Sequence, residues 1–470
     1  MDIDIQTMIN ALDGARPLLF TAGHAIAATV ACVHVLLKKR ESRAAQVWLI
    51  ICVFVPYLGP FAYFLLGINR IETRARRLRE PSEEPPEQDQ PDGLESRFAA
   101  VGRRVTRRAS LPGNAVRALE NGEAAYPAMI GAIDRAERFV YLCSYIFSND
   151  HIGKRFVAAL AAAQDRGVAV RVLVDSIGEW YSLPRIKREM ARADIPYRRF
   201  LPPRWFPPFG YVNLRSHRKL LIVDGDVGFT GGMNIGERHV MDRLGRRHAD
   251  DVHFELRGPV VADLAAVFTD DWRFACQEVL GAVPRSAPVE AAHWCRVVPD
   301  GPNEDMDKLA SVLQGAIANA ARSVSIMTPY FLPERDLMVG LQTAALRGVD
   351  VQVVIPARSN LPYVDWATRH LLPDLVSKGV KISVRQPFSH AKLFVADDEY
   401  ALIGTANLDP RSLRLNFELG VEVFDEGFAS SLSALIRSDD DVPVTTALLQ
   451  ARSLPVRLRD ATMALFTPYL

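Results

Sequence analysis

Residues 216–236 read SHRKLLIVDGDVGFTGGMNIG, and residues 389–409 read SHAKLFVADDEYALIGTANLD. Both stretches contain the pattern His-x-Lys-x-x-x-x-Asp and continue through a Gly-Gly or Gly-Thr pair to an Asn. The patterned residues are His217, Lys219, Asp224 and Asn234 in the first copy, and His390, Lys392, Asp397 and Asn407 in the second. One copy can arise by chance in a chain of 470 residues, but two copies with matching downstream residues indicate a functional repeat.

These residue types suit chemistry at a phosphodiester. A phosphodiester carries negative charge, so its attack needs a nucleophile that is uncharged at neutral pH and fixed positive charge for the non-bridging oxygens. One imidazole can attack phosphorus while a second protonates the leaving alkoxide and then deprotonates an incoming alcohol or water. The Lys and Asn side chains of both copies would donate hydrogen bonds to the oxygens where charge develops.

The apolar runs Leu220–Val223 and Leu393–Ala396 predict one buried strand in each copy. Because side chains alternate along extended backbone, the His and Lys of each copy, two residues apart, are expected on one face. Asp224 and Asp397 then fall in the turn that follows the strand. We predict that they are structural and hold this turn or a neighbouring amide.

The repeat extends upstream of the histidines. The segment RGVAVRVLV at 166–174 recurs as RGVDVQVVI at 347–355, and YIF at 145–147 recurs as YFL at 330–332. Each copy predicts strand, helix, strand and then the histidine strand, which is typical of an α/β sheet layered with helices. The first copy also carries PPRWFPPFGY at 202–211, which is either a lip for acyl chains or the membrane surface or a Pro-stiffened surface loop.

The N-terminal part is strongly apolar. Pro17–Leu37 and Ala44–Ile68 contain no Asp, Glu, Lys or Arg, and each is long enough as a helix to cross about 30 Å of hydrocarbon. We therefore predict two membrane segments and no cleaved signal peptide, since the N-terminus is acidic and a second apolar segment follows at once. Basic residues flank the second segment on both sides, so a two-span hairpin and a re-entrant path bent at residues 56–60 both stay open.

Whole-chain composition narrows the function classes. The formal net charge of +1 gives no general attraction to nucleic acid. Five cysteines without zinc or disulfide spacing suit a reducing cytoplasmic face. One dense set of potential metal ligands fits no standard spacing, so we expect no metal and no cofactor. The set comprises His239, His248, Asp250, Asp251 and His253.

These motifs resemble the phospholipase D superfamily and, within it, the membrane-anchored bacterial cardiolipin synthases. The matching segments are NLRSHRK at 213–219, FTGGMNIG at 229–236 and GTANLDPRSLRLNFEL at 404–419. The likeness covers nearly the whole chain, including RGPVV at 257–261 and FTPYL at 466–470. It implies two fused phospholipase D-like α/β domains related by a pseudo-twofold axis, each a mixed β-sheet layered with helices. The expected boundaries are an anchor at 1–79, a linker at 80–113, and domains at 114–290 and 291–470.

The resemblance also implies that an acidic residue downstream of each motif orients a histidine. Glu418 and Asp251 occupy these positions, with Asp250 as a rival because Ala249 and Asp250 stand where the family usually has an aromatic and a basic residue. Thr405 replaces a usual Ser and keeps the hydroxyl. We expect substrate contacts from Arg215, Gly232 and Thr405.

The implied activity is phosphatidyl transfer from one phosphatidylglycerol to another. It would proceed through a phosphatidyl-histidine, here assigned to His217, with release of glycerol and formation of cardiolipin. Alternatives are a phospholipase D-type hydrolase, a related transferase using another acceptor alcohol, or a membrane scaffold with an inactive site. The expected partners are phosphatidylglycerol and membrane lipids, not nucleic acid, and the oligomeric state stays open. The expected location is the bacterial inner membrane, with the catalytic domains on the cytoplasmic side.

Overall fold

The computed structural model describes residues 5–39, 42–67, 89, 93, 96–202, 214–241, 248–290, 293–302 and 305–467. The chain divides into a small N-terminal unit and a large unit, and each is described by itself. The basic cluster at 70–79 and residues 203–211 of the aromatic insertion lie outside the described residues.

Among its described residues, the N-terminal unit has one helix long enough to cross a membrane. Helix α1 (Ile5–Lys38) includes the apolar stretch Arg16–Lys38, about 35 Å in length. The second apolar segment is not one helix. It forms α2 (Ser42–Phe54), α3 (Leu58–Ala62) and η1 (Tyr63–Gly67), with a turn at 55–57. The break follows from Pro56, whose ring disfavours a helical residue before it and removes a backbone donor.

After this turn the chain runs back along α2. The Tyr63 hydroxyl lies 2.8 Å from Nδ1 of His34 on α1, and the Tyr63 ring lies 5.4 Å from that of Trp48 on α2. Within the turn, the Tyr57 hydroxyl donates a hydrogen bond to the carbonyl of Phe20 on α1. Helix α2 is about 20 Å long, which is too short to cross the hydrocarbon layer by itself. The expected second spanning helix therefore does not form. The chain bends instead, as in the re-entrant alternative.

The large unit begins with α5 (Ala99–Thr106) and then repeats one series of elements. The first half consists of β1 (Leu111–Glu120), α6 (Asn121–Asp134), β2 (Phe139–Ser144), α7 (His151–Asp165), β3 (Ala169–Asp175), η2 (Gly178–Tyr181), α8 (Lys187–Arg192), β4 (Tyr197–Phe200), β5 (Leu220–Val223), β6 (Val227–Gly231), η4 (Glu237–His239), β7 (Val252–Arg257) and α9 (Val260–Cys276). The second half consists of β8 (His293–Asp300), α10 (Lys308–Asn319), β9 (Ser323–Met327), α11 (Arg335–Leu346), β10 (Asp350–Pro356), α12 (Pro362–Ser377), β11 (Lys381–Arg385), β12 (Leu393–Ala396), β13 (Tyr400–Gly404), η5 (Arg411–Leu415), β14 (Glu418–Phe424), α13 (Glu426–Ile436), β15 (Val442–Pro443), α14 (Thr446–Gln450) and α15 (Leu454–Ala464).

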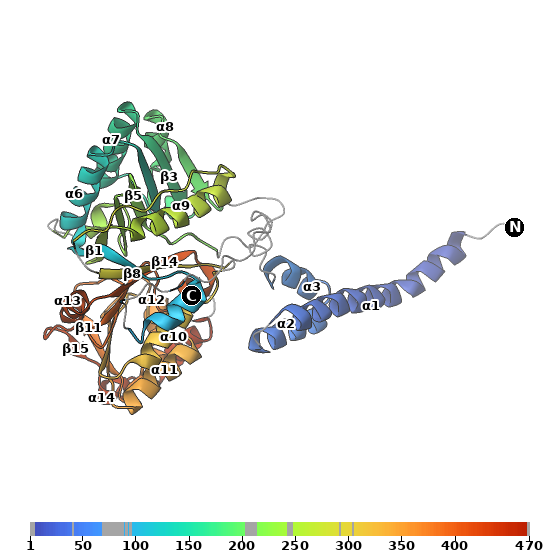
Figure 1. The fold of residues 1–470 in the computed structure, drawn as a ribbon. Coiled ribbons are helices and arrows are strands. Elements are labelled where there is room, and N and C mark those ends of the chain that lie inside the picture. The colour runs from blue at the N-terminus through green and yellow to red at the C-terminus, as the bar shows by residue number, and fades with distance from the viewer. Residues whose placement is uncertain are drawn as a thin grey trace. The chain divides into compact units, whose positions relative to one another are not determined.

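The strands form one continuous sheet with internal symmetry. The first half has the order β1-β7-β6-β5-β2-β3-β4, and the second half repeats it as β8-β14-β13-β12-β9-β10-β11. The halves join through the antiparallel pair β1 and β8, seen near the middle of the large unit in Figure 1. The strands β2-β3-β4 and β9-β10-β11 are parallel because helices connect them, whereas the neighbouring strands pair antiparallel. The expected mixed α/β sheet in two fused domains is confirmed.

Part of the predicted linker is ordered. Helix α5 lies within residues 80–113 and packs on the second half, where a Cβ on Gly315 would contact Val101 at 2.7 Å. The Phe98 ring stacks on Tyr400 with centroids 5.1 Å apart. The apolar groups at 98–101 thus gain burial that an extended solvated linker would not provide.

Candidate active site

The two motif histidines occupy equivalent places, three residues before β5 and β12. His217 and His390 are 8% and 5% exposed. Two residues on, Lys219 and Lys392 are also buried, and the Nζ of each donates to the carbonyl of the histidine in its own motif, at 2.7 Å and 2.5 Å. Each motif therefore holds an imidazole and an amine together on one face, as alternation predicted.

Glu418, on β14 of the second half, contacts the histidine of the first half. Its two carboxylate oxygens lie 3.0 and 3.1 Å from Nδ1 of His217. The Thr405 hydroxyl donates to Oε2 of Glu418 at 2.6 Å, and the Asn416 amide donates to Oε1 at 3.3 Å. The carboxylate is fully buried and held from three sides, so it orients the ring and leaves Nε2 as the reactive nitrogen.

Asp251, beside β7 of the first half, makes the matching contact with the second half. Its Oδ2 lies 2.9 Å from Nδ1 of His390, while its Oδ1 accepts from the amide of Val252. Asp250 instead uses its carbonyl, which accepts from the amide of His390 at 2.6 Å. Of the two rivals, the structure places the Asp251 carboxylate on the imidazole.

Two short main-chain bridges explain this exchange of partners. Ser216, before His217, pairs in parallel with Phe417, before Glu418. Ser389, before His390, pairs in the same way with Asp250, before Asp251. Each histidine segment is therefore registered against the acidic segment of the opposite half, and neither half contains a complete site by itself.

Burial dominates the protonation of the site. It lowers the pKa of His217 to about 4 despite the opposing charge of Glu418. It also lowers the pKa of His390 well below its ordinary value, with nearby Lys392 acting in the same direction. The imidazoles are therefore neutral at neutral pH, the form needed for a nucleophile.

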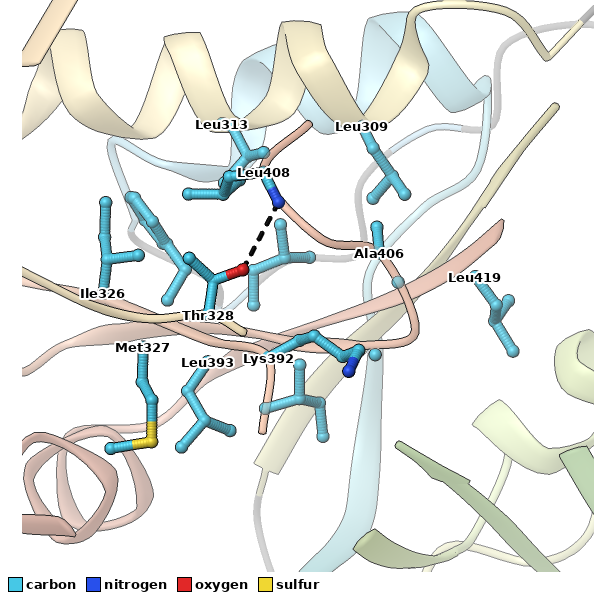
Figure 2. Close-up of a pocket in the computed structure, with 15 residues that line it drawn as sticks. Leu309, Leu313, Ile326, Met327, Thr328, Lys392, Leu393, Ala406, Leu408 and Leu419 are labelled. Carbon is cyan, nitrogen blue, oxygen red and sulfur yellow. Dashed lines mark hydrogen bonds between the residues drawn. The ribbon is translucent and has the colours of Figure 1, made fainter. Parts of the chain in front are cut away.

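The lysines are affected in the same way. Burial lowers the pKa of Lys219 to about 8 and that of Lys392 to about 7, although the Glu418 and Asp251 carboxylates act against it. Lys392 also borders a cavity of about 40 Å³ that is lined otherwise by uncharged residues such as Leu309 and Leu419 (Figure 2). An anion bound beside these amines would favour their charged form.

The motif asparagines differ in their partners. The Oδ1 of Asn234 accepts from the amide of Ile146 at 3.1 Å, which fixes the carboxamide and leaves its N–H groups as donors. The Oδ1 of Asn407 has no hydrogen-bond partner among the described residues. Both side chains are buried, and their carboxamide N–H groups are donors of the kind that a phosphoryl oxygen requires.

The motif aspartates lie at strand ends and bind main-chain amides. Asp224 accepts from the amides of residues 137–139 and Asp397 from those of residues 321–323. Each carboxylate thus ties the turn after the histidine strand to the start of a neighbouring strand, β2 or β9, because three donors converge on it.

The three residues expected to contact substrate lie against protein groups. Thr405 binds Glu418, as described above. A Cβ on Gly232 would lie 2.1 Å from Oδ1 of Asp251, so only glycine lets this carboxylate reach its position. Arg215 is 1% exposed and directs Nη1 toward the carbonyl of Leu201. These contacts favour positioning of the acids and of the histidine segment over direct substrate contact.

Sequence reasoning missed two tyrosines beside the motif histidines, whereas His239 was already named among the possible metal ligands. The Tyr145 ring lies 5.2 Å from that of His217, and the Tyr330 ring lies 6.4 Å from that of His390. His239 is fully buried, with Nδ1 3.8 Å from Oδ2 of Asp251. The tyrosines stand at the repeated YIF and YFL segments, so the repeat itself contained the signal.

Among the described residues, no group of three or more His, Cys, Asp or Glu side chains is arranged to hold a metal ion. The expectation of a metal-independent site stays a prediction. The residues that are present can supply a nucleophile, an acid–base group and cationic donors to a phosphodiester.

Comparison with known proteins agrees with this geometry. Residues 129–272 and 313–439 match the family described as cardiolipin synthase, phospholipase D-like domain, one match in each half. Residues 26–67 match the phospholipase D-nuclease N-terminal family.

Individual relatives match along most of the chain. Cardiolipin synthase A of Pseudomonas aeruginosa is 35% identical over 439 residues, covering 90% of this chain and 89% of the relative. Cardiolipin synthase A of Pseudomonas putida is 31% identical over 427 residues, covering 87% and 89%. The crystal structure of phosphatidylserine synthase from Haemophilus influenzae superposes with a TM-score of 0.61 at 14% identity, over 80% of this chain and 100% of that one, which shows a shared fold. The chain belongs to the phospholipase D-like cardiolipin synthase family.

Proposed function

We propose that this protein is a membrane-associated cardiolipin synthase that transfers a phosphatidyl group from one phosphatidylglycerol to another. The observation that carries the proposal is the pair of buried imidazoles, each oriented by a carboxylate from the opposite half. Family membership supports a phosphatidyltransferase acting on phospholipids. The buried lysines supply charge for the phosphoryl oxygens.

In the first step, Nε2 of His217 attacks phosphorus and the bond from phosphorus to the glycerol oxygen breaks. The bound anionic phosphodiester raises the pKa of His390, which takes up a proton as the substrate binds. His390 gives this proton to the glycerol oxygen, so glycerol leaves and a phosphatidyl-histidine remains. Glu418 stabilises the positive charge that develops on His217, because it accepts from Nδ1. Lys219, Lys392 and the two motif asparagines donate to the non-bridging oxygens.

In the second step, His390 takes the proton of a hydroxyl group on the second phosphatidylglycerol. The resulting oxygen attacks phosphorus, the bond to His217 breaks, and the product is cardiolipin. His390 then carries a proton again, as it did in the substrate-bound enzyme before the first step, and no co-reactant is needed.

Transfer in place of hydrolysis requires that water be kept out of the second step. The nearly complete burial of the motif histidines, lysines and asparagines supports this requirement. A phospholipase D-type hydrolase uses the same first step and then takes water, so it is the alternative to be separated by product analysis.

We also propose that the catalytic domains face the cytoplasm, on the same side as the residues between α1 and α2. The support is the turn at 55–57, which returns the chain alongside α2. Cysteines introduced at Lys39 and Lys154 should both resist a membrane-impermeant thiol reagent in intact cells and react after the inner membrane is opened. Labelling of only one of them in intact cells would indicate a second complete span.

The function is tested with purified protein and phosphatidylglycerol labelled in its glycerol headgroup and acyl chains. Cardiolipin plus free glycerol is the expected product pair. Phosphatidic acid plus glycerol would identify a hydrolase, and the absence of turnover would identify an inactive scaffold.

A further inference from the structure

The loop between β3 and α8 exposes large apolar side chains at its tip. Trp180, Tyr181 and Leu183 are 57%, 68% and 78% exposed. Large apolar side chains in such a group mark an interaction site more often than scattered single ones do. This group is separate in sequence from the aromatic insertion at 202–211, of which residues 203–211 lie outside the described residues.

The loop itself is firmly held, so its exposed tip is not a consequence of loose packing. Ile186 and Met190 are fully buried beneath it. Ser182 accepts a hydrogen bond from the amide of Asn149 at 2.8 Å. The buried carboxylate of Glu179 accepts from the Tyr197 hydroxyl at 2.5 Å. Packing and hydrogen bonds therefore hold the loop in a conformation in which its apolar tip is exposed to solvent.

The loop is also connected directly to the reactive histidine. Asp175 accepts from the amides of Ile177 and Gly178 at the start of the loop and from the amide of Ser216 next to His217. The Tyr181 ring lies 6.1 Å from that of Tyr145, which in turn lies 5.2 Å from the ring of His217. The tip is therefore joined through Tyr145 to the His217 side of the site.

Basic residues follow the apolar tip. The guanidinium of Arg185 lies 3.9 Å above the Trp180 ring, and the exposed Lys187 and Arg188 open helix α8. Glu189 is the acidic residue among them, and it pairs with Arg192 at 2.9 Å. An aromatic and aliphatic tip backed by net positive charge is the combination that sits at the boundary between acyl chains and anionic headgroups.

We propose that residues 180–188 insert their apolar tip into the lipid bilayer and place the opening of the active site against it. This inference rests on the proposed function in that the substrate is an anionic phospholipid supplied by that bilayer. A protein partner is disfavoured, because the basic residues match anionic headgroups and the loop is joined to the site that consumes them.

Depth in the bilayer is measured on the full chain in phosphatidylglycerol-containing vesicles. A nitroxide is attached at Leu183→Cys, with Leu346→Cys as the matched control, since Leu346 is 69% exposed on helix α11. The partly exposed Cys32 and Cys276 are replaced by Ala, and the other cysteines are buried. The label at 183 should be open to oxygen and closed to a water-soluble nickel chelate. The label at 346 should show the reverse, and a water-exposed label at 183 would overturn the proposal.

Activity supplies an independent measurement. The double variant Trp180→Ala with Leu183→Ala should lose about tenfold in turnover of bilayer phosphatidylglycerol, since two large side chains lose their burial in lipid. Its turnover of monomeric short-chain phosphatidylglycerol should stay within about twofold of the parent, which also reports an intact fold. The conservative pair Trp180→Phe with Leu183→Ile should keep bilayer activity.

The two arms separate the possible failures. Equal losses on bilayer and monomeric substrate, or no loss on either, would contradict the membrane role of the tip. Absence of cardiolipin formation by the unmodified protein on both substrates would refute the proposed function, while the depth measurement would still decide where the tip lies.

Discussion

The Glu418 carboxylate of the second half lies 3.0 Å from Nδ1 of His217 in the first half. The pseudo-twofold mate of this contact joins Asp251 to His390 at 2.9 Å. The active site is therefore a product of the interface between the halves, and each half supplies a histidine to the site and an acid to its partner. This arrangement predicts that damage to either half stops the whole reaction.

The variants His217→Ala and His390→Ala should each abolish transfer about as completely as the double variant. The two imidazoles act as a unit, and one acid–base group alone is typically worth about a hundredfold or more. Steady-state turnover of phosphatidylglycerol checks this. Residual activity above about a tenth in either single variant would show that the paired mechanism is wrong.

The variant Asp251→Asn should lower turnover by at least about a hundredfold, because an amide cannot stabilise the His390 imidazolium as a carboxylate does. Asp250→Asn is the matched control and should stay close to normal, since the backbone carbonyl of Asp250 makes its contact with His390. Lipid binding by Asp251→Asn should be nearly unchanged. The opposite order of sensitivity would reassign the acid.

Anion binding should strengthen as the pH falls from about 8 toward 5. Burial lowers the pKa of Lys219 to about 8 and of Lys392 to about 7, and holds that of His390 well below its ordinary value. A bound anion raises the pKa of all three groups, so anion binding is accompanied by proton uptake between about pH 8 and pH 5. Calorimetric titration with dimethyl phosphate, whose charge is constant there, in buffers of different ionisation heat should reveal proton uptake. Binding without proton uptake would contradict the assignment of these groups around the phosphate.

The variant Lys392→Met should unfold at a higher temperature than the parent at pH 6, while losing activity. Burial lowers the pKa of Lys392 from 10.5 to about 7, so the charged amine opposes folding. This unfavourable contribution to the free energy of folding is fully present below pH 7. It disappears as the pH rises toward 10.5, which is the pKa of Lys392 in the unfolded chain. The gain should be on the order of a few kcal/mol at pH 6 and smaller at pH 9.

Exposed Lys154→Met is the control for that stability measurement and should change the unfolding temperature little at either pH. A destabilised Lys392→Met at pH 6 would show that the hydrogen bond from Lys392 to the His390 carbonyl outweighs the cost of burying the charge.

The sequence by itself determined the features that depend on residues close together along the chain. The doubled motif, the strands at 220–223 and 393–396, the α/β class and the long apolar helix at the N-terminus all follow from local spacing and hydrophobic periodicity. Local patterns also placed the histidines and lysines on common faces, because alternation along a strand is a short-range property.

Only the tertiary structure decided how the distant parts combine. Glu418 and His217 are 201 residues apart, and Asp251 and His390 are 139 apart, so no local pattern relates them. Their pairing depends on two interhalf bridges, which also select Asp251 over Asp250. The position of helix α5 depends on its packing against the second half. The path of the chain after Pro56 depends on the contacts of Tyr63 with α1 and α2. The burial that sets the protonation of the two motif histidines and the two motif lysines likewise arises only when the two halves pack together.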